Sequence, residues 1–190
     1  MKPRDFQARI AVIVAAAMLL SGCAHEAQRW VKPGAAAIER LAVLPFENQT
    51  TAVRAGAVVS DLLVTELLAA RSGAVMDPSE VADLLRRDNI DAADPARWPS
   101  AQRIGRLLRV SHVMEGAVIE YRYKPGVSEA PAVGITARVV DVASGDVVWT
   151  ASVSRASTTW FREDGLARVA QSIARDMARH LAESLSSGAR

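Results

Sequence analysis

The chain has 190 residues, half of them hydrophobic, and its 23 Lys and Arg residues against 21 Asp and Glu residues give a formal charge of +2. The first 22 residues hold three of the bases and one of the acids, so 20 charges of each sign are left in the rest of the chain. Those 168 residues suit one domain with a sizeable core, and their balanced charge gives no reason to expect binding to nucleic acid.

The first 22 residues have the composition of a signal peptide. Basic residues come first, and the apolar run over residues 10–20 is about half as long as a membrane-spanning helix needs to be. The run ends in Leu-Ser-Gly-Cys at residues 20–23, which resembles the lipobox of bacterial lipoproteins, whose cysteine is acylated and becomes the new N-terminus. We therefore predict removal of residues 1–22 and a lipid at Cys23. The alternative is an ordinary signal peptide beside a chance cysteine.

A lipid at Cys23 has two physical consequences. Cys23 is the only cysteine of the chain, and a thioether removes a thiol that would be reactive in an exported protein. Each buried methylene contributes about 0.8 kcal/mol, so two or more acyl chains hold a protein stably on a membrane. Ala24 stands where an aspartate typically signals retention in the inner membrane. We therefore expect lipid anchoring to the periplasmic face of an outer membrane.

Residues 23–37 are polar and contain Pro and Gly, and we predict that they form a tether. Fully extended, the 15 residues from Cys23 to Ile38 reach only about 50 Å. The folded part, expected as a single domain over residues 38–185, must therefore lie close to the membrane.

The first half of this domain alternates strands with helices. An apolar, β-branched segment stopped by Pro45 predicts the first strand, and apolar residues at helical spacing predict the helix after it. Asp77 followed by Pro78 is typical of a further helix start. The expected elements are a strand at 38–46, a helix ending near 71, an edge strand at 74–76, a helix at 77–87, a loop at 88–99 and a helix at 101–109.

The second half predicts three strands, at 112–123, 133–142 and 147–156, and a C-terminal helix with an apolar stripe from residue 166. One face of the strands is apolar and is expected to include Ile119 and Trp149, whereas the other carries Arg138 and Ser152 and should meet water or a neighbouring subunit. The order β-α-β-α-α-β-β-β-α predicts an α/β (α+β) fold, a mixed sheet with helices mainly on one face.

Catalytic or metal-binding chemistry is not indicated. The three histidines, His25, His112 and His180, fall in distant segments without metal-ligand spacing, and a lipidated Cys23 supplies no thiolate. No phosphate-binding loop, dinucleotide fingerprint or nucleophile elbow occurs. We expect no enzymatic activity, and no cofactor or metal besides the covalent lipid.

Charge is segregated along the chain. Residues 77–94 hold six acids against two arginines, and residues 97–138 hold seven bases against three acids. Repeated around a symmetric ring, such patches would give one rim a single-sign field that attracts a charged polymer, whereas in a monomer they would be solvated faces. The candidate polymer-attracting acids are Asp77, Glu80, Asp83, Asp88, Asp91 and Asp94.

Three of the four tryptophans are candidates for an aromatic layer at the membrane–water boundary, where amphipathic rings are favoured. Trp30 follows the lipid by seven residues, and Trp160 lies at a strand end. Trp149 is on the apolar strand face, so core packing is its default interpretation, but it lies next to a hairpin and could project from the sheet end. Trp98, in the loop, is expected to cover a helix.

Two segments resemble a superfamily of bacterial envelope lipoproteins that includes the curli secretion lipoprotein CsgG and the peptidoglycan-synthase activator LpoB. They are LAVLPFEN at residues 41–48 and DVASGDVVW at residues 141–149, similar to that group's first strand and hairpin. A third segment, EYRYKPGVSEAPAVG at residues 120–134, is similar to the corresponding loop of the PelC family, outer-membrane lipoproteins of the Pel exopolysaccharide export apparatus.

The resemblance to the PelC family implies a non-enzymatic, ring-shaped homo-oligomer on the inner leaflet of the outer membrane. Its implied partners are an outer-membrane β-barrel exporter and Pel, a cationic polymer rich in partly deacetylated amino sugars. An electronegative periplasmic face would concentrate such a polymer at the exit, and we expect the acidic residues 77–94 to form that face.

Two other roles within the superfamily are alternatives. A curli-type secretion pore needs added amphipathic hairpins with strands of about 9–11 residues, and the connections of this chain are too short to supply them. An LpoB-like activator of a peptidoglycan synthase resembles a domain on a long disordered stalk, whereas the expected tether is short.

Overall fold

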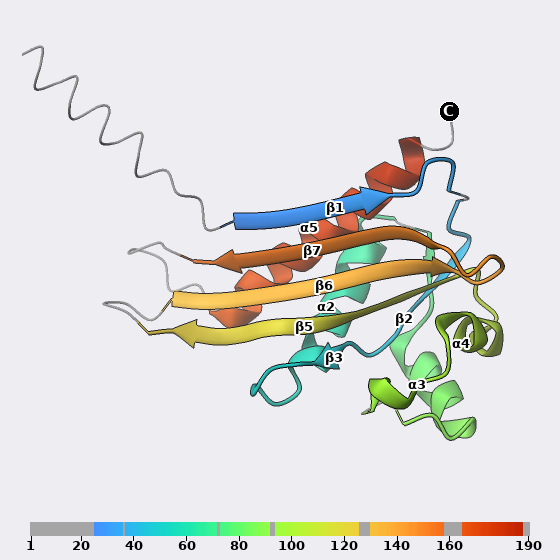
Figure 1. Ribbon diagram of the computed structural model, residues 1–190, viewed down its shortest axis with the longest axis horizontal. Coiled ribbons are helices and arrows are strands. Elements are labelled where there is room, and N and C mark those ends of the chain that lie inside the picture. Colours follow the sequence, from blue (N-terminus) through green and yellow to red (C-terminus); the bar gives the residue numbers. More distant parts are fainter. Residues whose placement is uncertain are drawn as a thin grey trace, which may run out of the picture.

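The computed structural model describes residues 25–35, 37–71, 73–91, 94–125, 130–157 and 165–187 (Figure 1). These residues form a seven-stranded mixed sheet in the order β1-β7-β6-β5-β2-β4, with β3 beside β5, and four α-helices. The strands are β1 (His25–Val31), β2 (Arg40–Val43), β3 (Glu47–Asn48), β4 (Ala74–Val75), β5 (His112–Lys124), β6 (Ala130–Asp141) and β7 (Val147–Ala156). The helices are α2 (Ala55–Ala69), α3 (Pro78–Arg87), α4 (Ala101–Leu108) and α5 (Leu166–Ser187), with a 3-10 turn η1 (Pro95–Arg97).

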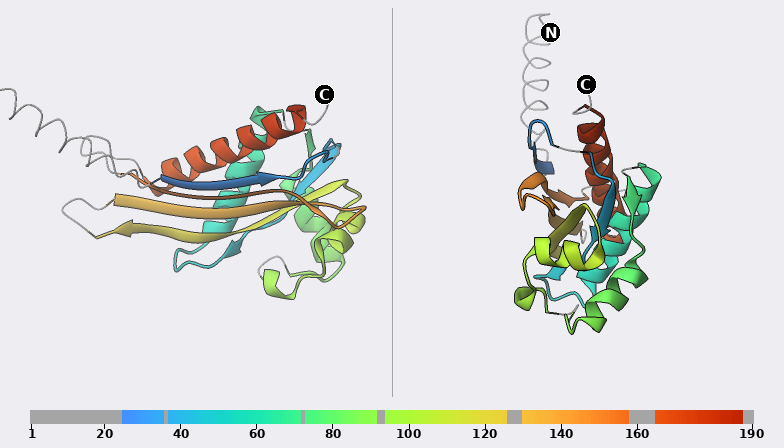
Figure 2. Two further views of the ribbon diagram at one scale, coloured as in Figure 1. Left: turned by 45° about the horizontal axis from the view of Figure 1, so that its top comes forward. Right: turned by 90° about the vertical axis from the view of Figure 1, so that its right-hand side faces the viewer.

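The predicted fold class is confirmed, because the elements from β2 to α5 include the expected order β-α-β-α-α-β-β-β-α. α2 and α5 pack together on one face of the sheet and enclose the larger core (Figure 2). α3 and α4 lie together at one end of the sheet and enclose a smaller core. Among the described residues, the long antiparallel part of the sheet carries helices on one face only, which we call the covered face; the other is the open face.

The burial of β2 explains why its sequence is a continuous apolar run. Leu41 and Val43 belong to the larger core, whereas Ala42 and Leu44 belong to the smaller one. A strand buried on both faces has no need of polar residues at alternate positions. β2 also pairs in parallel with β4 and β5, so it joins the helical end of the molecule to the long antiparallel strands.

The predicted tether is wrong for residues 25–31, because these form β1, which pairs antiparallel with β7 over its whole length. Ala27 and Val31 pack against the larger core, whereas Gln28 and Trp30 are exposed. β1 is an edge strand with one buried face, so its few small apolar residues resemble a linker in composition. The folded domain therefore begins well before residue 38.

The predicted apolar face of β5 also needs a correction. Met114 and Val118 face the larger core, and beyond the shift in the pairing with β6, between Val118 and Glu120, Tyr121 packs there instead. Ile119 therefore lies on the open face, where it is 43% exposed. It lies against Gly134, at which a Cβ atom would come within 2.9 Å of Ile119 Cγ1. A strict alternation cannot anticipate this reversal, because a bulge changes the parity of every residue beyond it.

Candidate functional site

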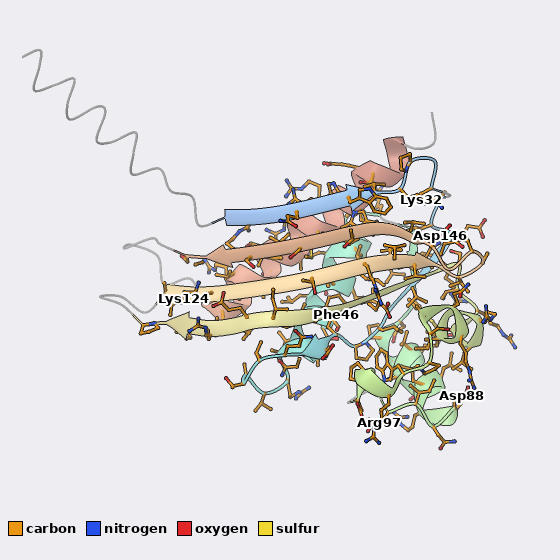
Figure 3. All side chains as sticks on the ribbon, in the orientation of Figure 1. Lys32, Phe46, Asp88, Arg97, Lys124 and Asp146 are labelled. Carbon is orange, nitrogen blue, oxygen red and sulfur yellow. The ribbon has the colours of Figure 1, made fainter. Side chains whose placement is uncertain are left out.

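The acidic residues predicted to attract a polymer fold into α3, the turn after it and η1. The Asp77 carboxylate caps α3 by accepting hydrogen bonds from the hydroxyl and the backbone N–H of Ser79, and these bonds lower its pKa. Val81 and Leu85 face the smaller core, which leaves the charged side chains of α3 in solvent. Figure 3 shows Asp88, at the end of α3, and Arg97 of η1 at the helical end of the molecule.

Half of the six acids form ion pairs with nearby arginines. The pairs are Glu80 with Arg40 of β2 (3.4 Å), Asp83 with Arg86 (2.7 Å) and Asp94 with Arg97 (3.1 Å). All three are exposed to solvent, so each contributes about 0–1 kcal/mol. The acidic field of α3 is therefore weaker than the count of carboxylates suggests, and Asp88 and Asp91 extend it beyond the helix.

α4 brings positive charge beside the acidic helix. It packs against α3 through the smaller core and exposes three arginines, Arg103, Arg106 and Arg109. From Asp77 to Arg109 the chain holds six acids and six arginines, so this end of the molecule has no formal net charge. The two charge blocks of the sequence are only partly separated in space: α3 is acidic and its neighbour α4 is basic.

A groove of about 660 Å³ lies between η1, α4 and the open face of the sheet. Trp98 and Gln102 line one side, and Glu115 and Arg138 the other. The Trp98 indole N–H donates to the backbone oxygen of Asp91 at 2.7 Å, and Arg138 pairs with Glu115 across the two strands at 2.6 Å. The arrangement can bind a polar ligand. Sequence reasoning missed the groove, because its walls come from segments that are distant in the chain, and no sequence motif indicates that they lie together.

Trp149 does not lie at a surface, so its prediction as a membrane-interface residue is wrong. It is 1% exposed on the covered face of β7, and its indole N–H donates to Nδ1 of His180 in α5 at 2.9 Å. Core packing, the default interpretation, is confirmed. A cavity of about 470 Å³ adjoins this pair, between the end of β1 and the last turns of α5.

The other two candidate tryptophans have different outcomes. Trp30 is 48% exposed and pairs with Thr150 near the end of β1, so it lies six residues of extended strand beyond Ala24. Trp160 lies outside the described residues, as does the predicted lipidation site Cys23. Their predicted roles stay predictions.

Within the described residues, no three His, Cys, Asp or Glu side chains come together as a metal site. His112 is buried at the start of β5, with Nδ1 2.9 Å from the Ser111 hydroxyl and Nε2 3.6 Å from the Asp141 carboxylate. Burial lowers the pKa of His112, although the Asp141 charge opposes this. The hydroxyl of Ser111 also bridges the backbone of Arg40, so this cluster links β2, β5 and β6.

α2 carries apolar side chains toward solvent as well as toward the core. Val58 and Leu68 are exposed, Leu68 by 54%, and Leu62 is half-buried between them. We call these three residues, which share the exposed side of the helix with Asp61 and Thr65, the outer stripe of α2. The opposite side of α2 packs into the larger core, whereas the described part of the chain leaves this side uncovered. In the sequence these residues are part of the apolar pattern that predicts the helix, and that pattern does not tell which of them are exposed.

No described helix combines the length and the apolar composition that crossing a membrane would require.

No protein-family model matches the chain, and no curated protein matches it. Solved structures do. A dodecamer of PelC from Paraburkholderia phytofirmans is 26% identical with a TM-score of 0.58, over 83% of this chain and 96% of that one. A variant of that dodecamer is 27% identical with a TM-score of 0.62, over 82% of this chain and 96% of that one. Lipoprotein GNA1162 from Neisseria meningitidis, at 18% identity and a TM-score of 0.56 over 73% and 96%, shares the fold.

Proposed function

The chain has the fold of PelC-like envelope lipoproteins, and on that premise we propose that it is a lipid-anchored outer-membrane protein whose copies form a ring and guide a cationic exopolysaccharide, Pel, to a β-barrel exporter. The single observation that carries the proposal is the extent of the likeness, which takes in nearly the whole PelC chain with about a quarter of the residues identical. The signal peptide and Cys23 support the anchor independently.

Assembly of identical copies has support from two sides. The PelC structures are dodecamers, and the outer stripe of α2 offers an apolar surface that a neighbouring copy would shield from water. The helix that carries the stripe, α2, lies on the covered face of the sheet, opposite the open face (Figure 2). Two unlike faces on opposite sides of one subunit are what a head-to-tail ring requires.

Guidance of a cationic polymer requires exposed carboxylates. Asp88 and Asp91 are exposed beyond the end of α3. Repetition around a ring would sum their fields into an acidic rim, even though each subunit is nearly neutral. Nothing in this role demands a nucleophile, a metal or a cofactor.

The test is a secretion assay in cells that lack the native gene and carry variants of the full-length protein. The double variant Asp88→Asn with Asp91→Asn should lower export of the polymer severalfold while the folded protein accumulates normally. Cys23→Ser, which cannot be acylated, should also lower export, because the ring would lose its place at the membrane. Glu47→Gln, an exposed acid on β3, is the matched control and should leave export unchanged.

Two results would contradict the proposal. Full export by Cys23→Ser would show that anchoring is not needed. Full export by the double aspartate variant would contradict the role of the acidic rim but not the anchor or the ring. The two parts of the proposal can therefore be refuted separately.

A further inference from the structure

The end of the sheet at which β1 begins lies beside the predicted lipid. Only Ala24 separates Cys23 from His25, the first residue of β1. Two steps between Cα atoms span at most about 7 Å. If Cys23 carries acyl chains, the start of β1 must therefore lie at the level of the lipid headgroups, since no tether intervenes.

The strand register identifies what else lies at this end. His25 is opposite Arg155 of β7, Arg155 is opposite Val133 of β6, and Val133 is opposite Tyr121 of β5. β5 continues past Tyr121 to Lys124, and three extended residues add about 10 Å. β5 therefore reaches at least as far along the strand axis as Cys23 does. Figure 3 shows Lys124 at this end and Asp88 at the other.

The described side chains at the end of β5 suit a headgroup region. Arg122 and Lys124 are exposed, and Tyr123, an amphipathic aromatic residue, is 47% exposed between them. Tyr, Lys and Arg are the residues that gather at membrane–water boundaries, with the basic groups directed to lipid phosphates. Glu120 pairs with both bases, at 3.0 Å from Arg122 and 3.6 Å from Lys124, which leaves one positive charge in excess.

We propose that each subunit stands with this end of the sheet on the membrane, so that Arg122, Tyr123 and Lys124 contact lipid headgroups and the α3–α4 end points away from the bilayer. The proposal rests on the lipid at Cys23 that the proposed function includes. In this orientation the acidic rim faces the periplasm, because α3 lies at the end of the subunit away from the bilayer.

The competing orientation lays β1 lengthwise on the bilayer. That arrangement would turn the unpaired backbone groups of an edge strand toward lipid, where nothing satisfies them, and would hold β5 three strand spacings, about 14 Å, away. Trp30 is the aromatic residue it would use. However, the Trp30 side chain leaves the strand on the open face and not along the edge, because strand side chains project to the faces of a sheet.

The experiment measures depth by spin labels on the lipidated full-length protein in vesicles of phosphatidylethanolamine and phosphatidylglycerol. Because acylation blocks the thiol of Cys23, a single new cysteine can be labelled in each of three variants: Tyr123→Cys, Trp30→Cys and Asp88→Cys. Collision with oxygen reports lipid, and collision with a water-soluble nickel chelate reports water. We expect the label at 123 to favour oxygen, and the labels at 30 and 88 to favour nickel by severalfold.

A label at 30 that favours oxygen while the label at 123 favours nickel would overturn the proposal in favour of the lengthwise orientation. Labels that all favour nickel would also overturn it. Mass spectrometry of the N-terminal peptide separates this result from the proposed function: absence of the lipid contradicts both, whereas a lipidated protein with position 123 in water contradicts the orientation alone.

Discussion

At the scale of single residues, the hydrogen bond from Trp149 to His180 joins β7 to α5 inside the covered core. Nδ1 of His180 can accept this bond only while it is unprotonated. Burial lowers the pKa of His180, the positive charge of Arg29 lowers it further, and Glu183 opposes the shift. Because the folded pKa lies below the unfolded value of 6.5, the unfolded chain binds the proton first as the pH falls. Stability is therefore present above that value and is lost on acidification through it.

We predict that His180→Asn weakens this pH dependence, because Asn Oδ1 can accept the bond in place of Nδ1 and does not titrate. The measurement is the free energy of unfolding in urea at a series of pH values between about 7.5 and about 5.5, spanning the histidine range. His180→Leu is the matched control: it should show the same weakened dependence but lose about 1–3 kcal/mol at neutral pH, because the Trp149 N–H is left without its acceptor. An unchanged slope in both variants would contradict the assignment.

At the scale of elements, α4 approaches the sheet through Gly105. A Cβ atom at this position would come within 2.2 Å of Val142 Cγ2 and 3.0 Å of Val113 Cγ2. Helix propensity alone would make Gly105→Ala stabilising by about 1 kcal/mol. The steric conflict has the opposite sign, and we predict a net loss of about 1–3 kcal/mol in the free energy of unfolding, measured in urea. The sign of the change in the free energy of unfolding thus shows whether the steric conflict or the helix propensity is the larger effect.

Two further variants separate packing from propensity at this helix. Arg106→Ala, on the exposed side of α4, should be close to neutral. Val142→Ala removes the methyl groups that the new Cβ would meet, so it should recover part of the stability lost in Gly105→Ala. Stabilisation by Gly105→Ala on its own would show that α4 does not pack this closely.

Most elements could be predicted from the sequence because their periodicity is set by burial on one side. The stripe of α5, with Val169, Ile173 and Met177 in the core, is an example. β1 could not, because an edge strand with one buried face needs only Ala27 and Val31 to pack, and its pairing partner lies more than a hundred residues away. For the same reason the candidate acids were found as one stretch of sequence, residues 77–94, while the arginines of α4 beside them were assigned to a separate region. Spatial neighbours that are distant in the chain leave no periodic signal.

At the scale of the whole molecule, the outer stripe of α2 bears on assembly. We predict that Val58→Ser combined with Leu68→Ser lowers the native mass of the lipidated protein extracted in mild detergent, because an apolar surface that joins copies would become polar. Both side chains are already exposed, so the monomer should unfold at nearly the same urea concentration.

Leu68→Met is the control for that experiment, since it keeps an apolar side chain of similar volume and should retain the native mass. A native mass equal to that of the unchanged protein in the double serine variant would show that copies meet through another surface. A monomeric mass for the unchanged protein in the membrane extract would contradict the homo-oligomer itself.

The attachment of the chain end to an edge strand also has a mechanical consequence. Traction transmitted from the bilayer through residue 23 would run along the axis of β1, and β1 is held by a ladder of hydrogen bonds to β7 over seven residue pairs. Force in that direction loads all of these bonds at once, in shear, whereas a pull across the strand would open them one after another. With the proposed lipid at Cys23, the domain would be joined to its anchor in the geometry that best resists being torn from it.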